Sequence, residues 1–166
     1  MANKQAGFEE CMTILGLDQL TRMAQDRGQP YRVLIVDDER WVREVFRDFC
    51  ELTGAFDIEL AQDGPQALEK LRAGRYDLIT LDLIMPEMSG LDVLEAIKEA
   101  APQIPIMVIT GNATERLVTQ AGVLGACRVI YKPVMLETFI NEIAATLQKR
   151  AAAENPTAAA VTGARR

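Results

Sequence analysis

Five short apolar runs, spaced roughly two dozen residues apart, constrain the fold of this chain more than any other feature. They occupy residues 33–36, 58–61, 78–81, 106–109 and 129–131 and are rich in Val, Ile and Leu. Between the first two runs, Val42, Val45, Phe46 and Phe49 recur at the spacing of one helical face, and Gly54 follows as a stop. Apolar strands linked by helices predict an α/β fold with a parallel sheet covered on both faces.

Four further helical patterns follow the later runs, around residues 67–74, 91–97, 117–121 and 136–147. The pattern is therefore five strands and five helices in strict alternation. Because crossovers between parallel strands are right-handed, few topologies remain, and a doubly wound open sheet is the expected one.

The two ends of the chain differ from this middle part. Residues 1–30 are predicted to form an N-terminal helical extension interrupted near Gly16, which serves either as a partner or dimer surface or simply packs on the domain. Residues 31–150 form the predicted main domain. Residues 151–166 contain seven Ala and only Val161 among the large apolar residues, so we expect a disordered tail into which the last helix can extend.

Composition excludes several classes of function. The chain of 166 residues has no His and a formal charge of −6, which excludes His-dependent catalysis and argues against binding of nucleic acid. Its three Cys are far apart and support neither a disulfide framework nor a zinc site. No apolar leader is present, and the longest uncharged stretch is interrupted by proline, so we expect a cytoplasmic chain without membrane insertion.

Polar residues follow four of the five predicted strands. They are Asp37 and Asp38 after the first strand, Asp82 after the third, Thr110 after the fourth and Lys132 after the fifth. In an open parallel sheet these positions lie together at the carboxyl edge, where ligands bind. Three carboxylates about 5 Å apart repel by roughly 3 kcal/mol per pair at an effective dielectric constant of about 20, so the cluster needs a cation. Oxygen ligands without His or Cys favour Mg²⁺, and a carboxylate beside Mg²⁺, a hydroxyl and a lysine indicates phosphoryl transfer.

Each of these residues also has a simpler interpretation. Asp38 alone is as well explained as the cap of the following helix, and Thr110 as a turn residue at the end of a strand. Only their occurrence together at four strand ends favours a site.

Four segments resemble the signatures of response-regulator receiver domains, and the resemblance covers about residues 31–150. The segments are 33–39 (VLIVDDE), 82–90 (DLIMPEMSG), 109–110 (IT) and 132–133 (KP). The resemblance implies a flavodoxin-like strand order, 2-1-3-4-5. It further implies a cytoplasmic role in two-component signalling, with a sensor histidine kinase or phosphotransfer protein as partner and Mg²⁺ as cofactor.

The same resemblance assigns roles to individual residues. Asp82 would accept the phosphoryl group from a phosphohistidine of the partner, and Thr110 and Lys132 would be the switch residues. Asp38, Asp82 and the backbone carbonyl of Ile84 would bind Mg²⁺, with Asp37 assisting through metal-bound water. A cis bond between Lys132 and Pro133 is also typical of the family.

The chain departs from the family pattern near its fifth strand. Receivers usually carry Tyr or Phe three residues before the lysine, where this chain has Val129, and Tyr131 lies on the same face of the strand. Gly111 and Val134 also replace more usual residues. We therefore expect phosphorylation to be retained but its readout to differ, at the fourth helix or the N-terminal extension. A homodimer could form through that extension or through the face made by the fourth helix, fifth strand and fifth helix.

Three functional hypotheses follow. The first is a stand-alone receiver, a phosphoacceptor domain rather than an enzyme, that acts through an unknown downstream protein. The second is the receiver part of a larger response regulator. The third is a phosphatase of the haloacid dehalogenase type, which is disfavoured because such enzymes have a second Asp where this chain has Ile84.

Overall fold

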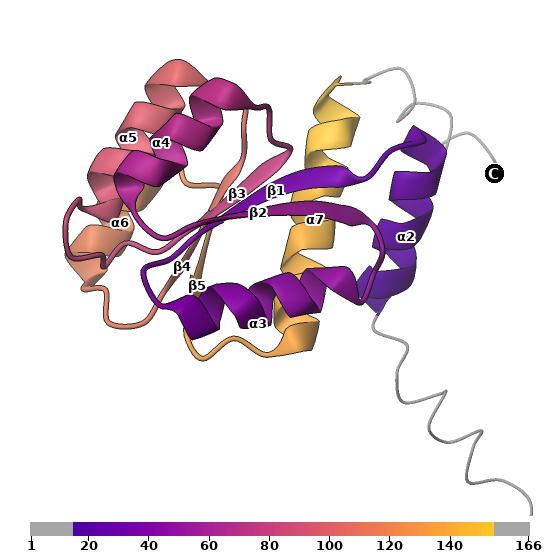
Figure 1. Cartoon of the computed structure of the whole chain (residues 1–166), viewed down its shortest axis with the longest axis horizontal. Helices are drawn as coiled ribbons and strands as arrows, with labels where there is room; N and C mark the ends of the chain where they lie inside the picture. The colour runs from indigo at the N-terminus through magenta and orange to yellow at the C-terminus, as the bar shows by residue number, and fades with distance from the viewer. Residues whose placement is uncertain (1–14, 155–166) are drawn as a thin grey trace, which may run out of the picture.

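A computed structural model describes residues 15–154 and has a five-stranded parallel sheet at its centre (Figure 1). The spatial order is β2–β1–β3–β4–β5, which confirms the predicted flavodoxin-like topology. The strands are β1 (Tyr31–Val36), β2 (Phe56–Ala61), β3 (Leu78–Leu81), β4 (Ile106–Thr110) and β5 (Arg128–Tyr131). All four pairings are parallel, so the carboxyl ends of the strands meet at one edge.

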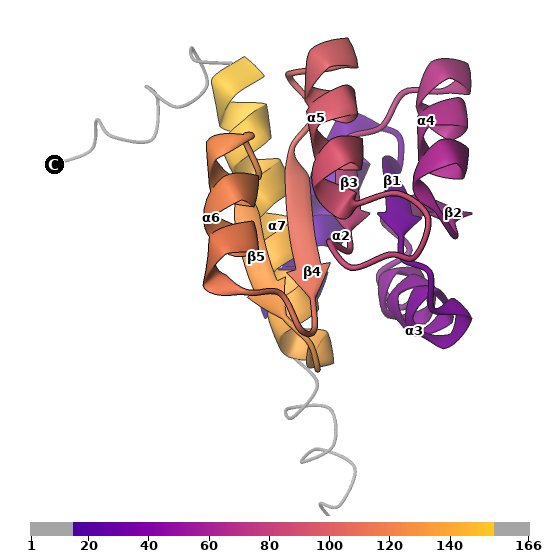
Figure 2. The same cartoon turned by 90° about the vertical axis from the view of Figure 1, so that its left-hand side faces the viewer.

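Helices cover both faces of the sheet (Figures 1 and 2). Those in residues 15–154 are α2 (Leu15–Arg27), α3 (Arg40–Glu51), α4 (Gly64–Ala73), α5 (Gly90–Ala100), α6 (Glu115–Val123) and α7 (Leu136–Glu154). Helices α3, α7 and α2 lie on one face, and α4, α5 and α6 lie on the other. No helix in this part of the chain is both long and apolar enough to cross a bilayer.

The apolar core has two layers because successive strand residues point to opposite faces of the sheet. In β1, Val33 and Ile35 belong to the layer under α3 and α7, whereas Leu34 and Val36 belong to the layer under α4 to α6. Both layers are fully buried at these positions. A strand buried on both faces explains why the sequence shows continuous apolar runs rather than alternation.

Helix α2 packs against α7 and closes one end of the core layer that lies under α3 and α7. Leu20 is completely buried there, and Thr21 Oγ1 donates a hydrogen bond to the carbonyl of Thr53 beyond α3. The described part of α2 begins at Leu15, so the predicted interruption near Gly16 falls at the limit of the described residues and stays a prediction. The Gly16 N–H donates to Asn141 Oδ1 at 3.0 Å, and a Cβ at this position would lie 2.6 Å from the same oxygen, so glycine permits the close approach of α7.

The buried face of α3 differs at one position from the sequence prediction. Its buried residues are Val42, Phe46 and Cys50, whereas Val45 is 37% exposed, because the helix packs Phe46 against Phe139 of α7. Helix α7 continues to Glu154, in keeping with the expectation that the last helix can extend into the tail. The rest of the predicted tail, residues 155–166, and residues 1–14 of the predicted extension lie outside the described part of the chain.

Candidate functional site

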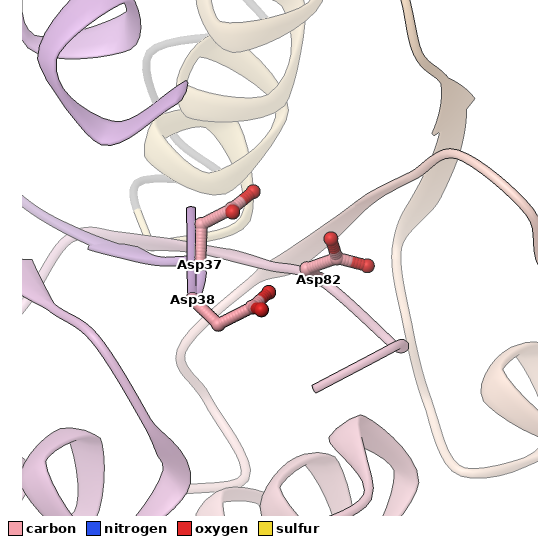
Figure 3. A group of neighbouring side chains, drawn as sticks. All are labelled: Asp37, Asp38 and Asp82. Atoms are coloured by element: carbon pink, nitrogen blue, oxygen red, sulfur yellow. The ribbon is translucent and has the colours of Figure 1, made fainter. Parts of the chain in front are cut away.

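Three aspartates meet at the carboxyl edge of the sheet (Figure 3). Asp37 and Asp38 directly follow β1 and Asp82 directly follows β3, and these two strands are neighbours with Val36 paired to Leu81. One carboxylate oxygen of each aspartate lies within 4.8 Å of those of the other two. Asp37 and Asp82 are buried, and Asp38 is the most accessible of the three.

Lys132 directly follows the edge strand β5 and bridges two of these aspartates. Its Nζ lies 2.7 Å from Asp37 Oδ2 and 2.6 Å from Asp82 Oδ2. Burial lowers the pKa of Lys132, but the hydrogen bonds to the two carboxylates outweigh burial and raise the pKa above its usual value. Burial raises the pKa of Asp37, against the opposing effect of Lys132. Lys132 is therefore charged at neutral pH, and the predicted cis bond to Pro133 is present beside it.

Two further donors hold the carboxylate of Asp82. Thr110, fully buried at the end of β4, donates from Oγ1 to Asp82 Oδ1 at 2.9 Å. The Ile84 N–H donates to the same oxygen at 3.0 Å. Asp82 is thus contacted by groups from the carboxyl ends of β3, β4 and β5. The sequence predicted that Thr110 and Lys132 would lie close to it.

Asp38 is not a helix cap. Helix α3 has Glu39 at its N-cap, and no side chain accepts a hydrogen bond from the first turn of the helix. Instead, Asp37 Oδ1 accepts from the Glu39 N–H at 2.9 Å and turns the chain away from β1. The simpler interpretation of Asp38 is therefore wrong, and its carboxylate faces the other two aspartates.

The cluster has the donor set that a hard divalent cation prefers. Three carboxylates are balanced by one contacting cation, Lys132, in the described part of the chain, which leaves a net negative charge in a largely buried place. A divalent ion bound by carboxylate oxygens removes this repulsion. The residues present therefore fit Mg²⁺. The backbone carbonyl of Ile84 as an additional ligand stays a prediction.

The loop between β3 and α5 requires glycine at its end. A Cβ at Gly90 would clash with the backbone of Asp82 and Leu83, and the Gly90 N–H donates to the Leu83 carbonyl at 3.1 Å. The loop thus folds back closely over the backbone that carries Asp82. This contact explains why the segment 82–90 ends in glycine.

Sequence reasoning missed one group beside the aspartates, the guanidinium of Arg43. Arg43 Nη1 donates to the backbone carbonyls of Asp37 and Asp38 at 2.6 and 3.0 Å. Glu39, which the sequence did place in the polar group after the first strand, accepts through Oε2 from the indole of Trp41 at 2.8 Å. Arg43 gave no signal in the sequence, because only the turn after β1 brings it to the site.

Val129, which stands at the usual aromatic position of the family, and Tyr131 on the same strand differ in their burial. Val129 is half-buried and packs in the layer under α4 to α6. Tyr131 is 54% exposed and pairs with Thr110 across β4 and β5. The position next to Val108 of β4 is thus occupied by the aliphatic side chain of Val129, while the ring of Tyr131 lies at the surface.

The family model that matches this chain is the response regulator receiver domain, over residues 33–144. Response regulator MprA of Mycobacterium sp. strain KMS is 36% identical over 136 residues, which cover 80% of this chain and 57% of the relative. MprA of Mycobacterium ulcerans strain Agy99 is 36% identical over 121 residues, covering 71% of this chain and 50% of the relative. The chain thus spans little more than half the length of these relatives.

Solved receiver structures agree with this match. The CheY-like receiver domain protein from Methanospirillum hungatei JF-1 superposes with a TM-score of 0.72 at 25% identity, covering 74% of this chain and 98% of that one. The chemotaxis protein CheY4 of Vibrio cholerae gives a TM-score of 0.67 at 27% identity, covering 70% of this chain and 98% of that one. Together with the matched segment, these likenesses show that the chain belongs to the response regulator receiver domain family of two-component signalling.

Proposed function

We propose that this chain is a phosphorylation-controlled receiver in which Asp82 accepts the phosphoryl group. The observation that carries the proposal is the convergence on one buried carboxylate of Thr110 and Lys132, at 2.9 and 2.6 Å. A hydroxyl and an ammonium group so placed lie where the oxygens of a phosphoryl group on Asp82 would need neutralisation.

The transfer forms one bond and breaks one. A carboxylate oxygen of Asp82 attacks the phosphorus of a phosphohistidine, the phosphorus–nitrogen bond breaks, and its electron pair stays on the imidazole of the donor. Lys132 moves from the carboxylate oxygens to the phosphoryl oxygens, and Thr110 donates its hydroxyl hydrogen to one of them. The product is an acyl phosphate on Asp82.

The aspartates Asp37, Asp38 and Asp82, with the carbonyl of Ile84, would hold Mg²⁺. Receiver domains are generally Mg²⁺-binding, and the acidic cluster of this chain fits the ion. When bound, Mg²⁺ neutralises charge on the phosphoryl oxygens. Asp37, which already bonds to Lys132, would assist through water on the ion.

The 166 residues contain no His, so the phosphohistidine would come from a donor outside them. Receiver domains interact with histidine kinases or phosphotransfer proteins, and one of these would be the donor. The phosphorylated chain would then change its contacts with a downstream protein and would turn over no separate substrate. Family membership decides against the haloacid dehalogenase alternative. The stand-alone form stays a prediction, because the matched relatives are longer.

The test is intact mass spectrometry after incubation with acetyl phosphate, with and without MgCl₂. We expect one labile phosphoryl adduct that requires Mg²⁺ and is absent from the Asp82→Asn variant. Thr110→Val serves as a nearly isosteric comparison, which keeps the acceptor and removes only the hydroxyl donor, so its adduct should form more slowly.

An adduct that persists in Asp82→Asn would place the acceptor elsewhere. No adduct in folded wild-type protein, with acetyl phosphate or with a phosphorylated histidine kinase, would refute phosphoryl acceptance.

A further inference from the structure

Arg43 holds the turn that carries two of the three aspartates. It lies on the second turn of α3 and reaches back so that Nη1 donates to the carbonyl of Asp37 at 2.6 Å and to that of Asp38 at 3.0 Å. Arg40 and Arg47 on the same helix pair with carboxylates. No carboxylate in residues 15–154 lies within ion-pair distance of Arg43, so its partners are these two backbone oxygens.

The position of these carbonyls decides where the side chains point. In an extended strand, adjacent side chains lie on opposite faces of the sheet, and Asp37 and Asp38 would then point apart. Their carboxylates instead lie within 4.8 Å of each other because the backbone turns directly after β1. One nitrogen of Arg43 can bond both consecutive carbonyls only while this turn is kept.

The turn is held from two sides. Asp37 Oδ1 accepts from the Glu39 N–H on one side, and this bond uses an oxygen of a carboxylate in the cluster. Arg43 holds the other side through backbone atoms alone, which leaves both carboxylates available for the cation. Among the described residues, Arg43 therefore contacts the backbone of this turn and none of the three carboxylates.

We propose that Arg43 is a positioning residue that aligns Asp37 and Asp38 for the divalent cation. This inference rests on the proposed function, since it assumes that the aspartates bind Mg²⁺. Groups that orient metal ligands through hydrogen bonds typically change metal affinity by about 10- to 100-fold when they are removed.

The direction of the effect separates this role from simple electrostatics. Arg43 is a positive charge near a cation site, and by Coulomb's law alone its removal would strengthen Mg²⁺ binding. A positioning role predicts the opposite, because the two carboxylates lose their alignment. Arg43→Gln should therefore bind Mg²⁺ more weakly although the site has become more negative.

The experiment is a titration of the ¹⁵N-labelled full chain with MgCl₂, followed by amide chemical shifts. We expect Arg43→Gln to raise the Mg²⁺ dissociation constant by about tenfold. Arg43→Lys, which keeps one cationic donor, should lie between this variant and the wild type. The matched control is Arg40→Gln, which removes the same charge from the same helix but loses only the exposed ion pair with Glu44, and its affinity should be unchanged or tighter.

A second measurement distinguishes positioning from folding. With acetyl phosphate, Arg43→Gln should need more Mg²⁺ for half-maximal phosphorylation, while its rate at saturating Mg²⁺ returns to within about twofold of the wild type, as expected when alignment alone is lost. A purely structural role would lower the melting temperature and leave the dissociation constant of the folded protein unchanged.

Each outcome decides the question. Unchanged or tighter Mg²⁺ binding in Arg43→Gln, with normal binding in the wild type, overturns the role of Arg43 and leaves the proposed function intact. Absence of Mg²⁺ binding in the wild type overturns both. If Arg43→Gln does not fold, the dissociation constant of Arg43→Lys decides: an increase relative to Arg40→Gln supports positioning, and equality refutes it.

Discussion

Replacing Leu20 by Ala tests whether α2 is part of the receiver core or an addition to its surface. Leu20 is completely buried and belongs to the same layer as Phe46, Phe139 and Leu147. Leu→Ala changes at such positions cost 2–5 kcal/mol, depending on how far the surroundings close the cavity. Helix α2 lies at the rim of the layer and can shift to fill part of the space, so we expect a loss of about 3 kcal/mol.

Urea unfolding followed by circular dichroism measures this loss. Because 1 kcal/mol corresponds to roughly 3 °C for a domain of this size, the melting temperature should fall by about 10 °C. Gln25→Ala is the matched control, since Gln25 is exposed on the same helix and its loss should stay within about 0.5 kcal/mol. A loss below about 1 kcal/mol for Leu20→Ala would show that α2 contributes little to the core, and would refute the reasoning.

Three further predictions concern the loop over Asp82, a buried phenol and the single tryptophan. Gly90→Ala should destabilise the fold by roughly 2 kcal/mol or more, because the added methyl group meets the backbone of Asp82. An unchanged midpoint of urea unfolding would contradict this. Burial raises the pKa of Tyr76 to about 12, above the ordinary value of 10.0. Stability should therefore fall as pH rises between these values, because the unfolded chain has already lost the phenolic proton there. Absorbance titration against Tyr76→Phe should show this late phenolate step, and its absence would refute the shift. The fluorescence emission of Trp41 should shift on addition of MgCl₂ or beryllofluoride. The shift should be smaller in Glu39→Ala, because the Glu39 carboxylate bonds the indole through one oxygen and lies 4.0 Å from Lys132 Nζ with the other. Equal shifts in both proteins would exclude this link.

The sequence predicted the fold correctly because the signals were local and repeated. Apolar runs separated by helical patterns define a parallel sheet, and its strand order followed from the family resemblance. Details that depend on packing were less predictable. Val45 fits the helical face of α3 by spacing, yet it is partly exposed because the crossing of α3 over α7 directs Phe46 onto Phe139. A single sequence does not contain such a crossing angle.

The candidate site shows the same division. The sequence by itself determined which residues stand at the ends of the strands, because the length of each apolar run sets where a strand stops; Asp37, Asp82 and Thr110 follow from this rule. Only the tertiary structure decided how these side chains are held. Lys132 bridges two carboxylates across the sheet, and Arg43 returns from a helix to hold the turn beneath them. These contacts join residues through the three-dimensional path of the backbone, and no periodicity along the chain encodes that path.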